Sequence, residues 1–111
     1  MDNRLYRVSK LIKEEVSKLI QKEITLDQGF ATVKEVEVTA DLHYATVWIS
    51  YIGHEEKECF VLLAAKQKDI QKTLNHLLNL KYVPLIEFKP DHSGDYVERI
   101  DQTIKDANQE Q

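Results

Sequence analysis

The chain has 111 residues, which suits one domain built around a single hydrophobic core. Its 42% hydrophobic content is ordinary for a globular protein, and no apolar run is long enough to span a membrane. The single cysteine, Cys59, cannot form an internal disulfide, and no apolar block after the first basic residues marks a secretory signal. We therefore expect a cytoplasmic protein of one domain, with no membrane partner.

The formal net charge is −4, but the charge is unevenly distributed along the chain. Residues 1–22 carry +3 and residues 66–90 carry +3, whereas residues 23–65 carry −6 and residues 91–111 carry −4. Two cationic segments could combine into one positive face that attracts a polyanion, because local potential steers binding more than total charge does. Charged, solvated helix faces are also common, so an ordinary surface is the open alternative.

Residues 4 to about 24 have the periodicity of an amphipathic helix. Its apolar stripe recurs at spacings of three and four, at Leu5, Val8, Ile12, Val16 and Leu19. Asp2 or Asn3 can cap its N-terminus. The basic side chains Arg7, Lys10 and Lys18 fall opposite the stripe, and Arg4 falls to one side of it. These four cations are candidate contacts to backbone phosphates.

A pair of strands is predicted between Val36 and Ser50, where apolar and polar residues alternate. The few residues around 41–43 leave room only for a turn, so the strands should pair antiparallel. A phase shift at Val33–Lys34 marks either a bulge or the start of the first strand. Trp48 and Tyr44 fall on the face opposite Val47, where they either pack on the sheet or stack on a base or partner.

Helical periodicity resumes at Glu55 and continues to about Leu80, with a polar interruption at residues 66–69. Two helices with a kink and one bent helix both fit this pattern. The interruption and its neighbours supply more cations, which are Lys66, Lys68, Lys72 and, after the helix, Lys81. A short strand follows at Leu85–Phe88, and Asp95 to about Ala107 predicts a last helix.

The predicted order is α-β-β-α-α-β with a C-terminal helix, an α+β fold in which helices cover one face of a three-stranded sheet. Residues 1–94 form the domain, and residues 95–111 form a helical extension whose last residues fray. The core should contain the five apolar residues Val38, Val47, Ile49, Leu74 and Leu77.

Enzyme signatures are absent from the sequence. Gly29, Gly53 and Gly94 lie too far apart for a phosphate-binding loop. His92 and Ser93 stand too close together in the chain to form a catalytic triad with a neighbour such as Asp95. The histidines and Cys59 lack the spacing of metal ligands, and Cys59 falls on an apolar helix face. We expect no catalytic residue, no cofactor and no metal.

Four segments in this order resemble the bacterial ribosome-binding factor A family, over about Arg4 to Ile104. They are Arg4-x-x-Arg7-Val8, Val36-Glu-Val-Thr39-Ala-Asp41-Leu42-x-x-Ala45-Thr-Val47-Trp-Ile-Ser50, Leu80-Lys81-Tyr82-Val83-Pro84 with Leu85-x-x-Phe88, and Asp91-x-Ser93. The resemblance implies a fold similar to the type II KH domain. Where the family usually has a small-x-Gly kink, this chain has Lys66-Gln67-Lys68, and the usual Arg pair is Gln71 and Lys81.

The resemblance also implies a function. The protein would bind the 30S ribosomal subunit or its precursor and contact 16S rRNA. It would assist late assembly of the subunit and processing of the 5′ end of 16S rRNA, and it would matter most for growth in the cold. It would be monomeric and would not be an enzyme. The alternative that stays open is a KH-like module that binds a protein partner instead of rRNA, and a small enzyme is a third class that no motif supports. Salt dependence separates the first two, because phosphate contacts release counterions.

Overall fold

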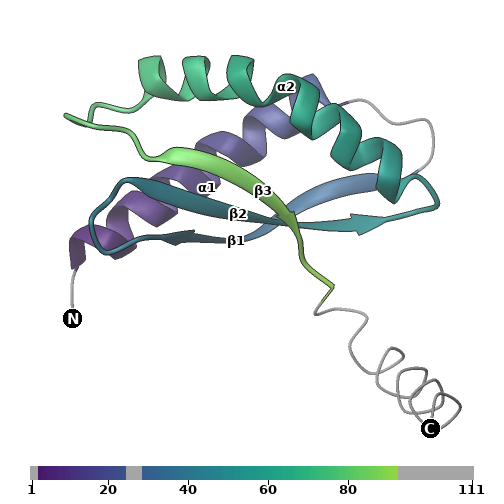
Figure 1. Ribbon diagram of the computed structural model, residues 1–111, viewed down its shortest axis with the longest axis horizontal. Coiled ribbons are helices and arrows are strands. Elements are labelled where there is room, and N and C mark those ends of the chain that lie inside the picture. The colour runs from purple at the N-terminus through teal and green to yellow at the C-terminus, as the bar shows by residue number, and fades with distance from the viewer. Residues whose placement is uncertain (1–2, 25–28, 93–111) are drawn as a thin grey trace, which may run out of the picture.

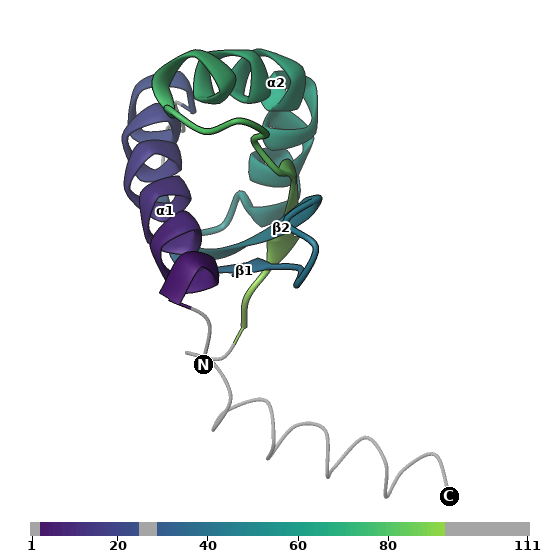
Figure 2. The same ribbon diagram turned by 90° about the vertical axis from the view of Figure 1, so that its left-hand side faces the viewer.

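A computed structural model describes residues 3–24 and 29–92 of the chain. The elements, in order, are α1 (Asn3–Glu23), β1 (Phe30–Val38), β2 (Tyr44–Ile52), α2 (Glu56–Leu77) and β3 (Leu85–Pro90). The three strands form one sheet, and both helices lie over the same face of it (Figures 1 and 2). The predicted α+β fold with a three-stranded sheet covered on one face is therefore confirmed.

The sheet has the order β1-β2-β3 and is mixed. The predicted antiparallel pairing of β1 with β2 is confirmed, with Val36 opposite Val47 in the register. The register shifts between Val33 and Glu35, so the phase shift in the sequence is a β-bulge at Lys34. β3 joins β2 in parallel, because α2 carries the chain back across the sheet between them.

The predicted α-β-β-α-α-β order is wrong between β2 and β3, where the chain has one helix instead of two. α2 is one uninterrupted helix, and Lys66 and Lys68 lie inside it. Lysine and glutamine are good helix formers, and no glycine or proline is present here to break the hydrogen-bond ladder. The axis of α2 changes direction along its length (Figure 1), so the chain forms the single bent helix.

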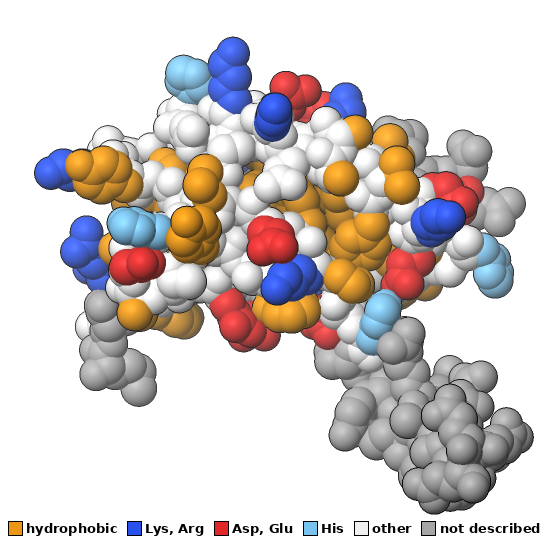
Figure 3. Space-filling view, in the orientation of Figure 1, with side chains coloured by type: hydrophobic (Ala, Val, Ile, Leu, Met, Phe, Trp, Pro, Cys, Tyr) orange, Lys and Arg blue, Asp and Glu red, His pale blue; other side chains and the backbone are white. Residues whose placement is uncertain are grey.

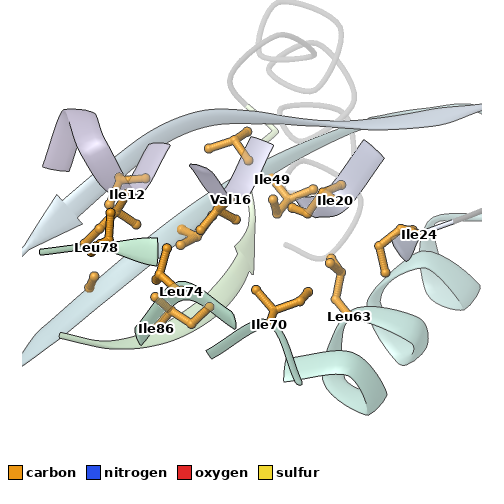
Figure 4. Packing of buried hydrophobic residues seen from close by; sticks show 14 of the residues in the cluster. Ile12, Val16, Ile20, Ile24, Ile49, Leu63, Ile70, Leu74, Leu78 and Ile86 are labelled. Carbon is orange, nitrogen blue, oxygen red and sulfur yellow. The ribbon is translucent and has the colours of Figure 1, made fainter. Parts of the chain in front are cut away.

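The core lies between the two helices and the sheet. Ile12 of α1 lies beside Leu78 and Val16 lies near Leu74, whereas Ile20 lies farther along α1, beside Ile49 (Figure 4). The sheet contributes buried side chains from all three strands, which are Val33, Val36, Ala45, Val47, Ile49 and Ile86. A continuous apolar layer thus joins elements that are far apart in the sequence.

Three of the five predicted core residues, Val47, Ile49 and Leu74, are buried, and Val38 packs half-buried against the same cluster. Leu77 is the exception, because its side chain is 53% exposed. The helix ends at this residue, and Leu78 adopts an extended backbone that turns its own side chain into the core. The prediction of a buried Leu77 is therefore wrong by one position.

Within residues 3–24 and 29–92, neither helix combines the length and the apolar character that crossing a membrane requires. The helix predicted over Asp95–Ala107, and with it the division into residues 1–94 and 95–111, extends outside the described residues.

Candidate nucleic-acid interface

The eight predicted RNA-binding side chains come from three elements. Arg4, Arg7, Lys10 and Lys18 lie on α1; Lys66, Lys68 and Lys72 lie on α2; and Lys81 lies in the loop before β3. Seven of them are exposed, and Lys66 is half-buried. The exposure follows from the periodicity of the two helices, which turn their apolar stripes toward the sheet.

Two of the four predicted cations of α1 border a groove against β1. The groove has a volume of about 630 Å³ and is lined by Lys10, Lys18 and residues of β1 such as Glu35. Lys18 Nζ lies 3.6 Å from Glu15 Oε1, one helical turn away. Arg7 and Lys10 have no ion pair with any described residue, so a phosphate could approach them without displacing a carboxylate.

The three lysines of α2 divide between two sides of the helix. Lys66 Nζ lies 3.8 Å from Glu23 Oε2, which links the middle of α2 to the end of α1. Lys68 and Lys72 line a shallow groove of about 330 Å³ on the side toward β3. Neither of these two has an ion pair within the part of the chain that the structure describes.

Two glutamines of α2 occupy the outer edge of β3. Gln71 Oε1 accepts from the Ile86 N–H at 2.8 Å, and Gln71 Nε2 donates to the Pro84 carbonyl at 3.1 Å. Gln67 Nε2 donates to the Ile86 carbonyl at 2.7 Å. Because these amides satisfy backbone groups that the sheet leaves unpaired, they fasten β3 under α2. Their spacing of four residues in the sequence is the one signal that could have indicated this role.

A third hollow brings together residues from both cationic segments. Arg4 from α1 and Lys81 from the loop before β3 line one cleft of about 380 Å³. The turn between β1 and β2 supplies its other wall, including Asp41 and His43. Basic, histidine and acidic side chains surround hydrophobic ones at this end of the molecule, on the left in Figure 3.

The β1–β2 turn is held by a network centred on Asp41. Asp41 Oδ1 accepts from Thr39 Oγ1 at 2.6 Å and from the His43 N–H at 3.0 Å. Both contacts lower the pKa of the Asp41 carboxyl, and the hydrogen bond from the Thr39 hydroxyl has the larger effect. Leu42 completes the turn with a positive φ of 64°. The carboxylate therefore stays ionised at neutral pH and fixes the shape of the wall.

The basic side chains do not gather into one patch on the face shown in Figure 3, where they are spread over the length of α2 and over the end of the molecule beside the turn. The structure brings Arg4 close to Lys81 and places Lys68 beside Lys72, whereas Lys66 turns toward α1. That all eight act together on one RNA surface stays a prediction.

Trp48 is half-buried on the face of the sheet away from the helices. Its Nε1 donates to Glu37 Oε1 at 3.1 Å, and Lys89 Nζ lies 6.0 Å from the ring. These contacts favour the packing interpretation for Trp48. Tyr44 on the same face is 58% exposed and stays available to a partner.

The cysteine and histidine side chains that could have been catalytic or metal-binding contribute to packing and to contacts between elements instead. Cys59 is fully buried in the core, and burial, together with the nearby Glu56 carboxylate, raises the pKa of its thiol. His92 Nε2 lies 2.7 Å from Glu56 Oε2 and so ties the end of β3 to the start of α2. No cluster of metal-ligating side chains occurs among the described residues.

The fold and these surfaces define a small α+β domain that exposes basic side chains on both helices. The family model of ribosome-binding factor A matches residues 4–104. The chain is 37% identical to ribosome-binding factor A of Macrococcus caseolyticus over 114 residues, covering 99% of each chain. It is 33% identical to that of Caldanaerobacter subterraneus, covering 100% of this chain and 94% of the relative. The chain belongs to the ribosome-binding factor A family.

Solved structures of the family have the same fold. The crystal structure of ribosome-binding factor A from Thermus thermophilus superposes with a TM-score of 0.66 at 19% identity, over 78% of this chain and 94% of that one. A homology model of the Thermus thermophilus protein, fitted into the cryo-EM map of a 30S–ribosome-binding factor A complex, gives 0.65 at 19% identity, over 76% and 91%. Membership in this family places the chain with non-enzymatic assembly factors.

Proposed function

We propose that this protein binds the 30S ribosomal subunit or its precursor through 16S rRNA and assists late assembly and 5′-end processing. The family match over residues 4–104 carries the proposal. The Thermus thermophilus relative in a 30S complex supports it, since the two chains share a fold. We also propose that the fold is of the KH-like type II kind, that the protein acts as a cytoplasmic monomer, and that residues 1–94 bind rRNA while residues 95–111 form a helical extension.

The charge arrangement supplies a physical basis for binding. Arg7, Lys10, Lys68 and Lys72 are exposed and have no ion pair with a described residue. Phosphate contacts at such side chains release condensed counterions without first breaking an internal pair. Three of the four are lysines, which present a point charge rather than the two-pronged guanidinium of Arg7, so we expect these contacts mainly to position the RNA rather than read its sequence.

The test is co-sedimentation with small subunits across a salt series. The variant with Arg7, Lys10, Lys68 and Lys72 all changed to Glu should bind more weakly. Its plot of log affinity against log salt should be flatter by up to about 3.6 units, at about 0.7–0.9 unit per lost phosphate contact. Far-UV circular dichroism should be unchanged because none of the four is in the core.

A matched control changes four other exposed lysines, Lys22, Lys34, Lys57 and Lys89, to Glu. It lowers the net charge by the same amount and should keep more of the affinity and slope. If both variants lose binding equally, only total charge matters and the assigned surface is wrong. If the first variant binds like the wild type, the protein-binding alternative gains support, and Tyr44 on the helix-free sheet face becomes the first residue to test.

A further inference from the structure

We propose that the cleft between the start of α1, the β1–β2 turn and the loop before β3 binds one unpaired nucleotide, with its base stacked on Tyr82. The inference rests on the proposed function, because the nucleotide would belong to the bound RNA. It adds a site for a single base to the phosphate contacts that the proposed function assigns to the exposed cations.

The cleft has the shape and lining that a nucleotide requires. Its volume is about 380 Å³, and its apolar lining includes Val8, Leu42 and Leu80. Arg4 and Lys81 line the same cleft and supply positive charges for the phosphate of the nucleotide. Apolar surface beneath a base with cations at the rim is the combination used by proteins that bind single strands.

Tyr82 provides the stacking surface. It lines the cleft, and its side chain is 73% exposed, the highest value among the large hydrophobic residues that the structure exposes. Lys81 Nζ lies 5.6 Å from the ring centroid. An exposed aromatic ring is otherwise unfavourable in water, and a base covering it would remove apolar area from solvent on both partners.

The opposite wall is rigid enough to hold a base in place. The hydrogen bonds to Asp41 Oδ1 close the turn, and the His43 carbonyl accepts from the Leu85 N–H at 2.9 Å, which fastens the turn to the start of β3. The turn is therefore joined to the start of β3, which follows Tyr82 closely in the sequence. A site that needs no ordering on binding loses less entropy.

Asp41 also makes the cleft selective. Its side chain is 59% exposed, and its Oδ2 faces His43 Nδ1 at 3.5 Å. Asp41 Oδ1 already accepts two hydrogen bonds, so Oδ2 is the atom that would accept from a base N–H, and guanine presents two adjacent N–H donors to it on the Watson–Crick edge. Uracil offers one donor flanked by two carbonyl oxygens, which a carboxylate repels. We therefore expect the cleft to prefer guanine over uracil.

The experiment measures fluorescence anisotropy of three probes: a guanine-containing single-stranded RNA hexamer, an oligo-uridine hexamer and a 20-base-pair RNA duplex. Tyr82→Leu keeps apolar bulk but removes the stacking face, and it should weaken the guanine-containing hexamer about tenfold and leave the duplex unchanged. Tyr82→Phe should bind like the wild type. Phe30→Leu is the matched control, because Phe30 is also exposed, at 59%, but lies at the start of β1 outside the cleft.

Asp41→Asn separates recognition from folding. The amide keeps an oxygen that can accept from Thr39 and His43, so thermal melts should stay close to the wild type while the preference for guanine over uracil falls severalfold. The inference is overturned if the wild type does not bind the hexamers, if Tyr82→Leu binds them normally, or if it weakens the duplex equally. In those cases normal co-sedimentation of the wild type with small subunits would leave the proposed function standing.

Discussion

Gln71 should contribute more to stability than its half-buried position suggests. Replacing it with Ala removes the acceptor for the Ile86 N–H and the donor to the Pro84 carbonyl. Ile86 is only 2% exposed, so its N–H would lose a partner where water has little access. An orphaned buried backbone group costs about 1–3 kcal/mol, and a second lost hydrogen bond adds about 0.5–1.5 kcal/mol. We expect Gln71→Ala to lower the free energy of unfolding by about 1.5–4.5 kcal/mol.

Urea titration followed by circular dichroism would measure this loss, and the melting temperature should fall by roughly 10 °C for a domain of this size. Asn75→Ala is the control. Asn75 Oδ1 also accepts from Gln71 Nε2, at 3.0 Å, but this contact is on the surface and its loss should cost less than about 0.5 kcal/mol. Equal stability of Gln71→Ala and Asn75→Ala would show that the amide does not hold β3 in place.

Three further changes test the fold and the turn. Val47→Ala should cost about 1–3 kcal/mol in urea titration, because Val47 is fully buried at the centre of the sheet, and an unchanged melt would remove it from the core. Gly29→Ala should destabilise by at least about 2 kcal/mol, because φ is +102° and a Cβ would collide with the Ile52 carbonyl oxygen; wild-type stability would contradict this backbone geometry. Folding depresses the pKa of Asp41, so its contribution is present above an unfolded pKa of about 3.9 and is lost as pH falls further. The stability difference between wild type and Asp41→Ala should therefore shrink between pH 6 and pH 2, and a difference independent of pH would exclude this role.

The strand pair could be predicted because its signals are local. Alternation between Val36 and Ser50 specifies which side chains face the core, and the phase shift locates the bulge at Lys34. The parallel pairing of β2 with β3 has no such signal. Ala45 meets Ile86 only because α2 returns the chain across the sheet, so the contact depends on tertiary packing.

The error at α2 has the same origin. A polar run such as residues 66–69 is compatible with a break and with a turn of helix that is solvated on one side. Packing decides between them: Lys66 pairs with Glu23 of α1, and Gln67 reaches Ile86 of β3, so both polar side chains have partners in the helical conformation. The periodicity of the sequence alone could not predict these contacts between elements.

The exposure of the candidate site residues could be predicted from the sequence, but their arrangement could not. Helical periodicity correctly predicts that Arg7, Lys10 and Lys72 are exposed, whereas the cleft that Arg4 and Lys81 both line exists only because α1 and the loop before β3 converge. Tyr82 was visible in the sequence only as part of a motif ahead of a proline. Its exposure became evident once the loop was placed beside the turn.

Both edges of the sheet discourage a partner that would bind by adding a strand. At the β3 edge, Gln67 and Gln71 already bond the carbonyl and N–H of Ile86. At the β1 edge, the bulge at Lys34 and the charged residues beside it interrupt a flat template for pairing. We therefore expect recognition to use side chains of the helices and loops, including Arg7, Lys10, Lys68 and Lys72, which have no ion pair with a described residue. A partner held by backbone pairing would show little dependence on salt, whereas one held by these cations would show a steep one, so the salt series tests the edges of the sheet as well as the basic faces.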